Sequence, residues 1–135
     1  CRACGTSVGR HISLDFSAEE AARAQAELEE QTRAQASAAP QAFLTSAERF
    51  HLFLSELTRN NRMIHLMQRR RSRFFTAGLY VLKRPDRMNT TIREHTAVIE
   101  ALEKNDAEAA AAAMLNHLHN GRSLMFWACR AEHGA

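Results

Sequence analysis

The sequence has 135 residues, a formal net charge of +3 and a hydrophobic content of 45%. This length fits a single domain with its own buried core, and the composition is that of an ordinary globular protein. No apolar run approaches the roughly 20 residues of a membrane span, and no signal-peptide pattern is present, so we expect a cytoplasmic protein without membrane contact. The small positive charge does not by itself indicate nucleic-acid binding.

The first half of the chain predicts two helices. A capping box of Ser17 and Glu20 opens a helix rich in Ala and Glu, which fades around residues 36–39. Pro40 then starts a second helix, because proline is well tolerated in the first turn. The apolar spacing continues this helix to about Thr58.

The second half predicts three more helices. The third spans about 62–82 and cannot continue through Pro85, and the fourth spans about 88–104. The fifth opens after the capping residues Asn105 and Asp106. Because short loops join these helices, the predicted fold is all-α, an antiparallel bundle of about five to six helices.

Three histidines fall on the apolar stripes of three different helices. His51 borders the stripe of the second helix, His95 lies between Ile92 and Ile99 at helical spacing, and His117 continues the stripe of the last helix. A single buried imidazole is more often a hydrogen-bonded core residue than a ligand. Three inward imidazoles instead indicate a shared polar centre that binds a metal or an anion.

A basic run at residues 69–73 gives a second signal. Such a run is usually a solvated helix face or a patch that contacts phosphate. However, Arg70 and Arg71 occupy the gap between Met67 and Phe74, where a turn of the apolar stripe is expected. A buried guanidinium requires an anion, and a carboxylate suits its planar fork. We therefore predict that Arg71, or Arg70 if the helix phase is shifted by one, holds a carboxylate ligand.

Several motifs surround the inward histidines in a characteristic order. They are Phe-His at 50–51, Leu54, TRNNRM at 58–63, REHTAVIEALEKND at 93–106 and MLNHL at 114–118. Over about residues 17–125 the sequence resembles the C-terminal effector-binding (FCD) domain of FadR-subfamily GntR transcriptional regulators. The resemblance implies an all-α fold, a homodimer and a ligand-sensing role without enzymatic activity.

The resemblance also implies a ligand set. In many members of the family an aspartate and three histidines bind a divalent metal, and the carboxylate of a small organic acid completes the coordination with help from arginine. The three histidines correspond to His51, His95 and His117. The aspartate, expected four residues before the first histidine, is replaced by Ala47. Glu48 lies about 100° further round the helix and cannot simply take its place.

Three neutral imidazoles still suit zinc or nickel, but we expect lower metal affinity without the anionic ligand. Some family members lack the metal and bind acyl-CoA. A metal-free acyl-binding or other small-ligand-binding bundle, or a dimerisation bundle, is therefore the alternative. A metal-dependent hydrolase is a weaker one, because only Glu94 lies near an inward histidine as a possible base.

The expected domain organisation follows from the same comparison. Residues 1–16 form an irregular N-terminal segment, and residues 17–130 form the helical effector-binding domain. The winged helix-turn-helix domain that reads DNA in this family does not fit into the N-terminal segment. We therefore expect DNA contact only through a domain that this sequence does not include.

Overall fold

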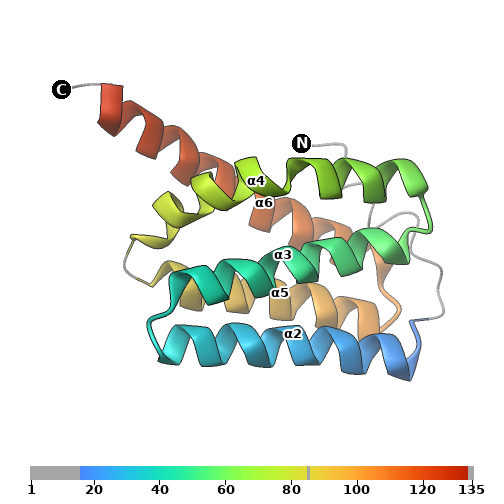
Figure 1. The fold of residues 1–135 in the computed structure, drawn as a ribbon. Coiled ribbons are helices and arrows are strands. Elements are labelled where there is room, and N and C mark those ends of the chain that lie inside the picture. The colour runs from blue at the N-terminus through green and yellow to red at the C-terminus, as the bar shows by residue number, and fades with distance from the viewer. Residues whose placement is uncertain (1–15, 85, 134–135) are drawn as a thin grey trace.

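The computed structural model describes residues 16–84 and 86–133, with the backbone alone at 70–74 and 125–133. Within these ranges the chain is helical and contains no strand. The helices are α2 (Ala18–Ala36), α3 (Pro40–Leu57), α4 (Asn61–Leu82), α5 (Arg87–Glu103) and α6 (Ala107–His133) (Figure 1). The all-α prediction is confirmed, and the predicted spans agree closely with the observed ones.

Side-chain caps fix the starts of α2, α4 and α6. The Ser17 hydroxyl accepts a hydrogen bond from the Glu20 N–H at 3.1 Å, and the Glu20 carboxylate accepts one from the Ser17 N–H at 2.8 Å. The Asn60 side chain accepts bonds from the first N–H groups of α4, and the Asp106 carboxylate accepts one from Ala109. These caps satisfy N–H groups that have no partner within their own helix.

Tight turns connect the successive helices. Each of the four connections contains a non-glycine residue with positive φ. These residues are Ala38, Arg59, Asp86 and Asn105, with φ between 49° and 61°. Ala38, Arg59 and Asn105 lie in the short turns that follow α2, α3 and α5, whereas Asp86 directly precedes α5. A left-handed residue reverses the chain in few residues, which lets α3, α4 and α6 pack beside their predecessors.

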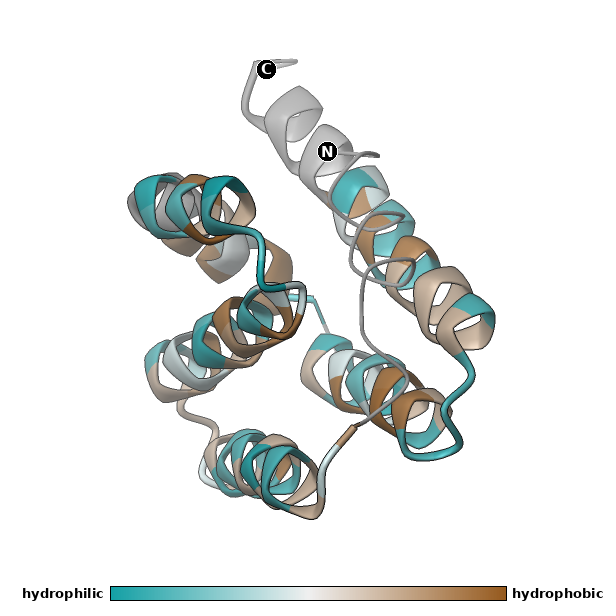
Figure 2. Cartoon of the chain, turned by 90° about the vertical axis from the view of Figure 1, so that its right-hand side faces the viewer, coloured by the Kyte–Doolittle hydropathy of each residue, from teal (hydrophilic) through white to brown (hydrophobic). Residues whose placement is uncertain are grey.

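The helices surround a common interior. Neighbours in space run in the order α4, α3, α2, α5 and α6, and α6 packs back against α4. Figure 2 shows the helices nearly end-on around this interior, most with hydrophilic residues on one side and hydrophobic residues on the other. The buried core includes Ala24, Leu28, Phe50, Phe53, Leu54, Val98, Ile99, Ala101, Leu102, Ala110 and Met114.

Helix α4 is less buried than its sequence predicts. Ile64, Met67 and Phe75 from the expected stripe are only half-buried, and the side chain of Phe74 lies outside the described part. Leu66 is also exposed. The core cluster draws its members from the other four helices. The described residues of this stripe thus lie at the edge of the core, whereas Val81 near the end of α4 is buried.

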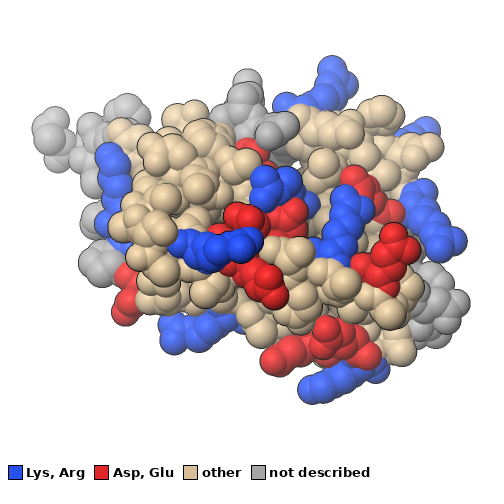
Figure 3. Space-filling view, turned by 60° about the horizontal axis from the view of Figure 1, so that its bottom comes forward, with Lys and Arg blue, Asp and Glu red and all other residues tan. Residues whose placement is uncertain are grey.

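The face formed around α2 carries charges of both signs. Figure 3 shows acidic and basic side chains next to one another on this face. Three ion pairs contribute to this mixture, Arg23–Glu56, Arg33–Glu30 and Arg49–Glu27. Among the described residues of this face we find no extended patch of one sign, which phosphate backbones would require. No helix in the described ranges is long and apolar enough to cross a membrane.

Phe50 should be a major contributor to stability. It is fully buried and stacks on the His95 ring with centroids 4.3 Å apart. Phe50→Ala should lower the free energy of unfolding by about 3–5 kcal/mol, because the substitution leaves a cavity in the core. Urea denaturation of the metal-free protein measures this loss. Tyr80→Ala, at a position 41% exposed, is the control, and an equal loss there would contradict the assignment of the core.

Candidate metal centre

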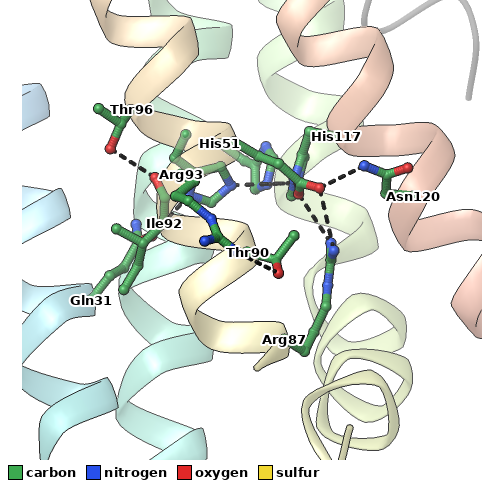
Figure 4. Close-up of polar contacts among 11 residues, drawn as sticks. Gln31, His51, Arg87, Thr90, Ile92, Arg93, Thr96, His117 and Asn120 are labelled. Carbon is green, nitrogen blue, oxygen red and sulfur yellow. Dashed lines mark hydrogen bonds and ion pairs between the residues drawn. The ribbon is translucent and has the colours of Figure 1, made fainter. Parts of the chain in front are cut away.

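Three imidazoles converge in the interior of the bundle. His51 comes from α3 and His117 from α6 (Figure 4), and His95 comes from α5. Nε2 of His117 lies 3.4 Å from Nε2 of His95 and 3.2 Å from Nε2 of His51. One ring nitrogen of each histidine lies within 4.8 Å of the others. The structure therefore brings together the three residues that the sequence patterns single out.

Two of the three separations between these nitrogens suit one divalent ion. With metal–nitrogen bonds of about 2.0–2.1 Å, two nitrogens on one ion lie about 3.0 Å apart at a right angle and about 3.4 Å apart in a tetrahedron. The observed separations of 3.2 and 3.4 Å fall within this interval. A set of imidazole donors matches zinc, nickel or a similar ion. The residues present thus fit the metal that the sequence predicts.

Two of the rings are held by hydrogen bonds on their outer nitrogens. His95 Nδ1 lies 2.8 Å from Oε1 of Gln31, and His117 Nδ1 lies 2.7 Å from Oε2 of Glu94. Both oxygens only accept, so each Nδ1 carries the proton and donates. Each Nε2 therefore presents a lone pair to the centre. This is the arrangement that fixes tautomer and orientation in metal-binding histidines.

The lowered pKa values of two of the histidines favour the binding of a cation. Burial, and then the charge of His117, lower the pKa of His51 to about 3. Burial also takes the pKa of His95 well below its ordinary value, with further contributions from His117, His51 and Arg87. At neutral pH His51 and His95 are therefore uncharged, and a metal does not have to displace protons from them.

Glu94 organises the outer side of His117. Its carboxylate accepts hydrogen bonds from His117, from Asn120 at 2.7 Å, and from both terminal nitrogens of Arg87 at 3.3 and 3.2 Å (Figure 4). Burial alone would raise the pKa of Glu94, but the bonds from His117 and Asn120 and the charges of His117 and Arg87 lower it. Glu94 is therefore a buried carboxylate whose charge is shared by three partners.

A cavity of about 100 Å³ adjoins the histidines. All three imidazoles line it, together with residues of α3, α4, α5 and α6. Its apolar lining includes Phe43, Leu44, Phe75, Val81, Leu82 and Leu118. Gly78 allows α3 and α4 to approach here, because a Cβ at this position would lie 2.6 Å from Cδ2 of Leu44.

Ala47 and Glu48 behave as their helical positions predict. Ala47 is buried, lines the cavity and precedes His51 by about one turn of α3. Glu48 also lines the cavity, but the cluster of converging ligand atoms comprises the three histidines without it. Ala47 therefore supplies no anionic ligand at the position where the resemblance implies an aspartate, and Glu48 is not among the converging ligands of the described residues.

The remaining site predictions have different outcomes. Arg70 and Arg71 lie on α4, but their side chains fall outside the described part, so their ligand role stays a prediction. His65 and His119 are exposed, in keeping with their positions off the apolar stripes. His11 lies outside the described residues.

The sequence patterns contain a signal for Glu94 that our interpretation missed. Thr91, Glu94, Val98 and Ala101 are all buried and recur at the same i, i+3, i+7, i+10 spacing as the stripe of His95. Gln31 similarly lies on the buried stripe of α2. A lone polar residue on such a stripe needs a buried partner. Arg87 continues the stripe of Glu94 by one turn, four residues before Thr91, and Asn120 follows His117 by three residues on α6.

The family is decided by comparison with known proteins. A family model described as the FCD domain matches residues 7–120, which is more than half of the chain. The chain belongs to the FCD domain family. FCD domains are the effector-binding domains of GntR-family regulators, so this FCD domain is a ligand-sensing regulatory domain. The comparison with curated proteins gives no match.

Proposed function

We propose that this FCD domain is the sensor of a cytoplasmic, homodimeric transcriptional regulator of the FadR subfamily. In this proposal His51, His95 and His117 hold a divalent metal, and a small organic acid binds beside it in the cavity. The observation that carries the proposal is the convergence of three ring nitrogens, two pairs of which have separations suited to one ion. DNA recognition would belong to a separate domain.

The chemistry of the site favours an acid as the effector. Three neutral imidazoles bring no negative charge to a +2 metal, and Ala47 contributes no anion. A carboxylate oxygen is a good ligand for zinc and carries the charge that the site lacks. The neighbouring apolar lining would accept the carbon skeleton of the acid.

Helix α4 is the proposed source of a carboxylate clamp. Phe75 and Gly78 line the cavity from this helix. Arg71 precedes Phe75 by four residues, and residues four apart occupy the same face of a helix. This register favours Arg71 over Arg70 as the effector-binding arginine.

A sensor accounts for the site better than a hydrolase does. Glu94, the one carboxylate considered as a base, is bound to Arg87, Asn120 and His117. A general base must instead be able to reach and take up the proton of a reacting water. The buried network therefore holds Glu94 in a positioning role.

Metal should raise the Tm of the domain, and small carboxylic acids should raise it further once metal is bound. After removal of metal with EDTA, Zn²⁺ or Ni²⁺ at 100 times its dissociation constant should raise Tm by about 10 °C, since such binding contributes about 2.7 kcal/mol. Small carboxylic acids should raise Tm further in the presence of metal. Differential scanning fluorimetry measures both steps.

Each possible result of this titration favours one function. No response to either metal would reject the metal centre. Equal stabilisation by acids with and without metal would favour a metal-free ligand site. Steady turnover of an ester or amide substrate panel by the Zn²⁺-loaded domain would favour the hydrolase.

A further inference from the structure

The three partners of Glu94 hold it with unequal geometry. The bonds from His117 and Asn120 are short, 2.7 Å each. The two bonds from Arg87 measure 3.3 and 3.2 Å, which is long for a charged pair that ordinarily approaches to about 2.7–2.9 Å. The guanidinium is therefore the partner that Glu94 would release most readily.

Arg87 also belongs to the cavity. It is only 6% exposed, yet it lines the cavity beside the three histidines. Its two hydrogen bonds within the described part of the chain both go to Glu94, whereas a guanidinium has five N–H donors. Gly121 faces the same group, and even a Cβ there would remain 4.0 Å from the nearer nitrogen. A buried cation with spare donors thus borders the space where an anion would bind.

We infer that Arg87 is shared between Glu94 and an anion in the cavity, and that through Glu94 it sets the strength with which His117 binds the metal. This inference rests on the proposed function. When Arg87 pairs with Glu94, it withdraws negative charge from the carboxylate that accepts the His117 Nδ1–H bond. An anion that draws Arg87 toward the cavity leaves that charge on Glu94, which strengthens the bond and makes Nε2 a better donor to metal.

Metal and anion would therefore favour each other through Arg87, in addition to any direct contact between them. An anion that raises the metal affinity must have its own affinity raised by the metal, by the same factor. Arg87 is a positioning residue in this arrangement, because it acts on the metal through Glu94 and His117. Removing Arg87 should consequently tighten metal in the absence of an anion, which is unusual for the loss of a buried partner.

The first test is a double-mutant cycle with Zn²⁺ alone, measured by competition with a chromophoric chelator. Arg87→Met should tighten Zn²⁺ by several-fold, and Glu94→Gln should weaken it by about 10-fold, the lower end for a residue that orients a metal ligand. If Arg87 acts mainly through Glu94, the variant with both changes should lie much closer to Glu94→Gln than the sum of the two single effects would place it. Weaker Zn²⁺ binding by Arg87→Met, or effects that simply add, would overturn the inference.

Two further variants guard against a general structural effect. Arg93→Met removes an exposed arginine from the same helix and should leave Zn²⁺ binding unchanged. Arg87→Lys keeps a buried cation but lacks the fork, and should tighten Zn²⁺ less than Arg87→Met does. If Arg87→Met does not fold without metal, the cycle is run with Arg87→Lys, and additive effects again overturn the inference.

The hydrogen bond itself provides a readout that a general loss of packing would not produce. In the metal-free protein the proton NMR resonance of His117 Nδ1–H should move downfield in the Arg87 variant, since a stronger charged acceptor deshields the proton. The resonance should stay in place in Arg93→Met. An unchanged or upfield resonance in the Arg87 variant would contradict the proposed route.

The final test uses acetate as the anion. Acetate should raise the affinity of the parent for Zn²⁺, and the factor should be smaller in the Arg87 variant. An equal factor in both proteins would reject the sharing of Arg87. If the parent binds no Zn²⁺, the inference and the proposed function fail together, whereas Zn²⁺ binding with an additive cycle rejects the inference alone.

Discussion

Replacement of His95 by leucine should abolish the stabilisation of the domain by metal. His95 is fully buried and supplies one of three nitrogens in a site without an anionic protein ligand. Two imidazoles are a poor ligand set, so the affinity for Zn²⁺ should fall by more than the roughly 10- to 100-fold that follows the loss of a mere orienting residue. Leucine still fills the space against Phe50, which keeps the bundle folded.

The experiment compares the Tm values of parent and variant with EDTA and with Zn²⁺. The parent should respond to Zn²⁺ and His95→Leu should not, while circular dichroism in EDTA verifies that both are helical. His119→Leu is the matched control, because His119 is exposed two residues after the buried His117. If Zn²⁺ raised the Tm of His95→Leu as much as that of the parent, the converging histidines would not be the metal site.

The helices were predictable because their signals are local. The capping box at Ser17, the cap at Asp106 and the proline at position 40 all lie at the starts of observed helices. Such signals act over three or four residues, so the remainder of the fold does not have to be known. The depth at which a helix is buried in the bundle, by contrast, is not set by local signals. Periodicity shows which face of α4 turns inward, but the packing of the other four helices leaves that face half-buried.

The site was predictable only in its inner part. His51, His95 and His117 each lie on an apolar stripe. Their inward positions can therefore be predicted from the periodicity of each helix separately. The pairing of His95 with Gln31, and of His117 with Glu94, depends on the register between helices that are far apart in sequence. A sequence pattern reveals that a buried Glu94 needs a partner, but it does not identify the partner.

Ala47 occupies the position from which an aspartate would reach the three imidazoles. Its side chain is buried, lines the cavity and lies about one turn before His51 on α3. An aspartate at this position would point a carboxylate into the cavity beside the imidazoles. In the proposed metal centre the parent relies on neutral donors, so the proposed acid effector would supply part of the charge that holds the metal.

Ala47→Asp should therefore tighten Zn²⁺ on the order of 10- to 100-fold, because an anionic ligand joins the three imidazoles. In the metal-free protein the same change should lower stability, since it buries a carboxylate among uncharged rings. The rise in Tm on adding Zn²⁺ should thus exceed that of the parent. Acetate should bind the Zn²⁺-loaded variant less tightly, because the new carboxylate neutralises charge that attracts the acid.

Ala42→Asp, which adds the same charge at an exposed position of α3, is the control. It should leave the Zn²⁺ affinity, the stability of the metal-free protein and the acetate affinity near the parent values. Unchanged Zn²⁺ affinity in Ala47→Asp would mean that the three histidines are a hydrogen-bonded polar core rather than the metal centre.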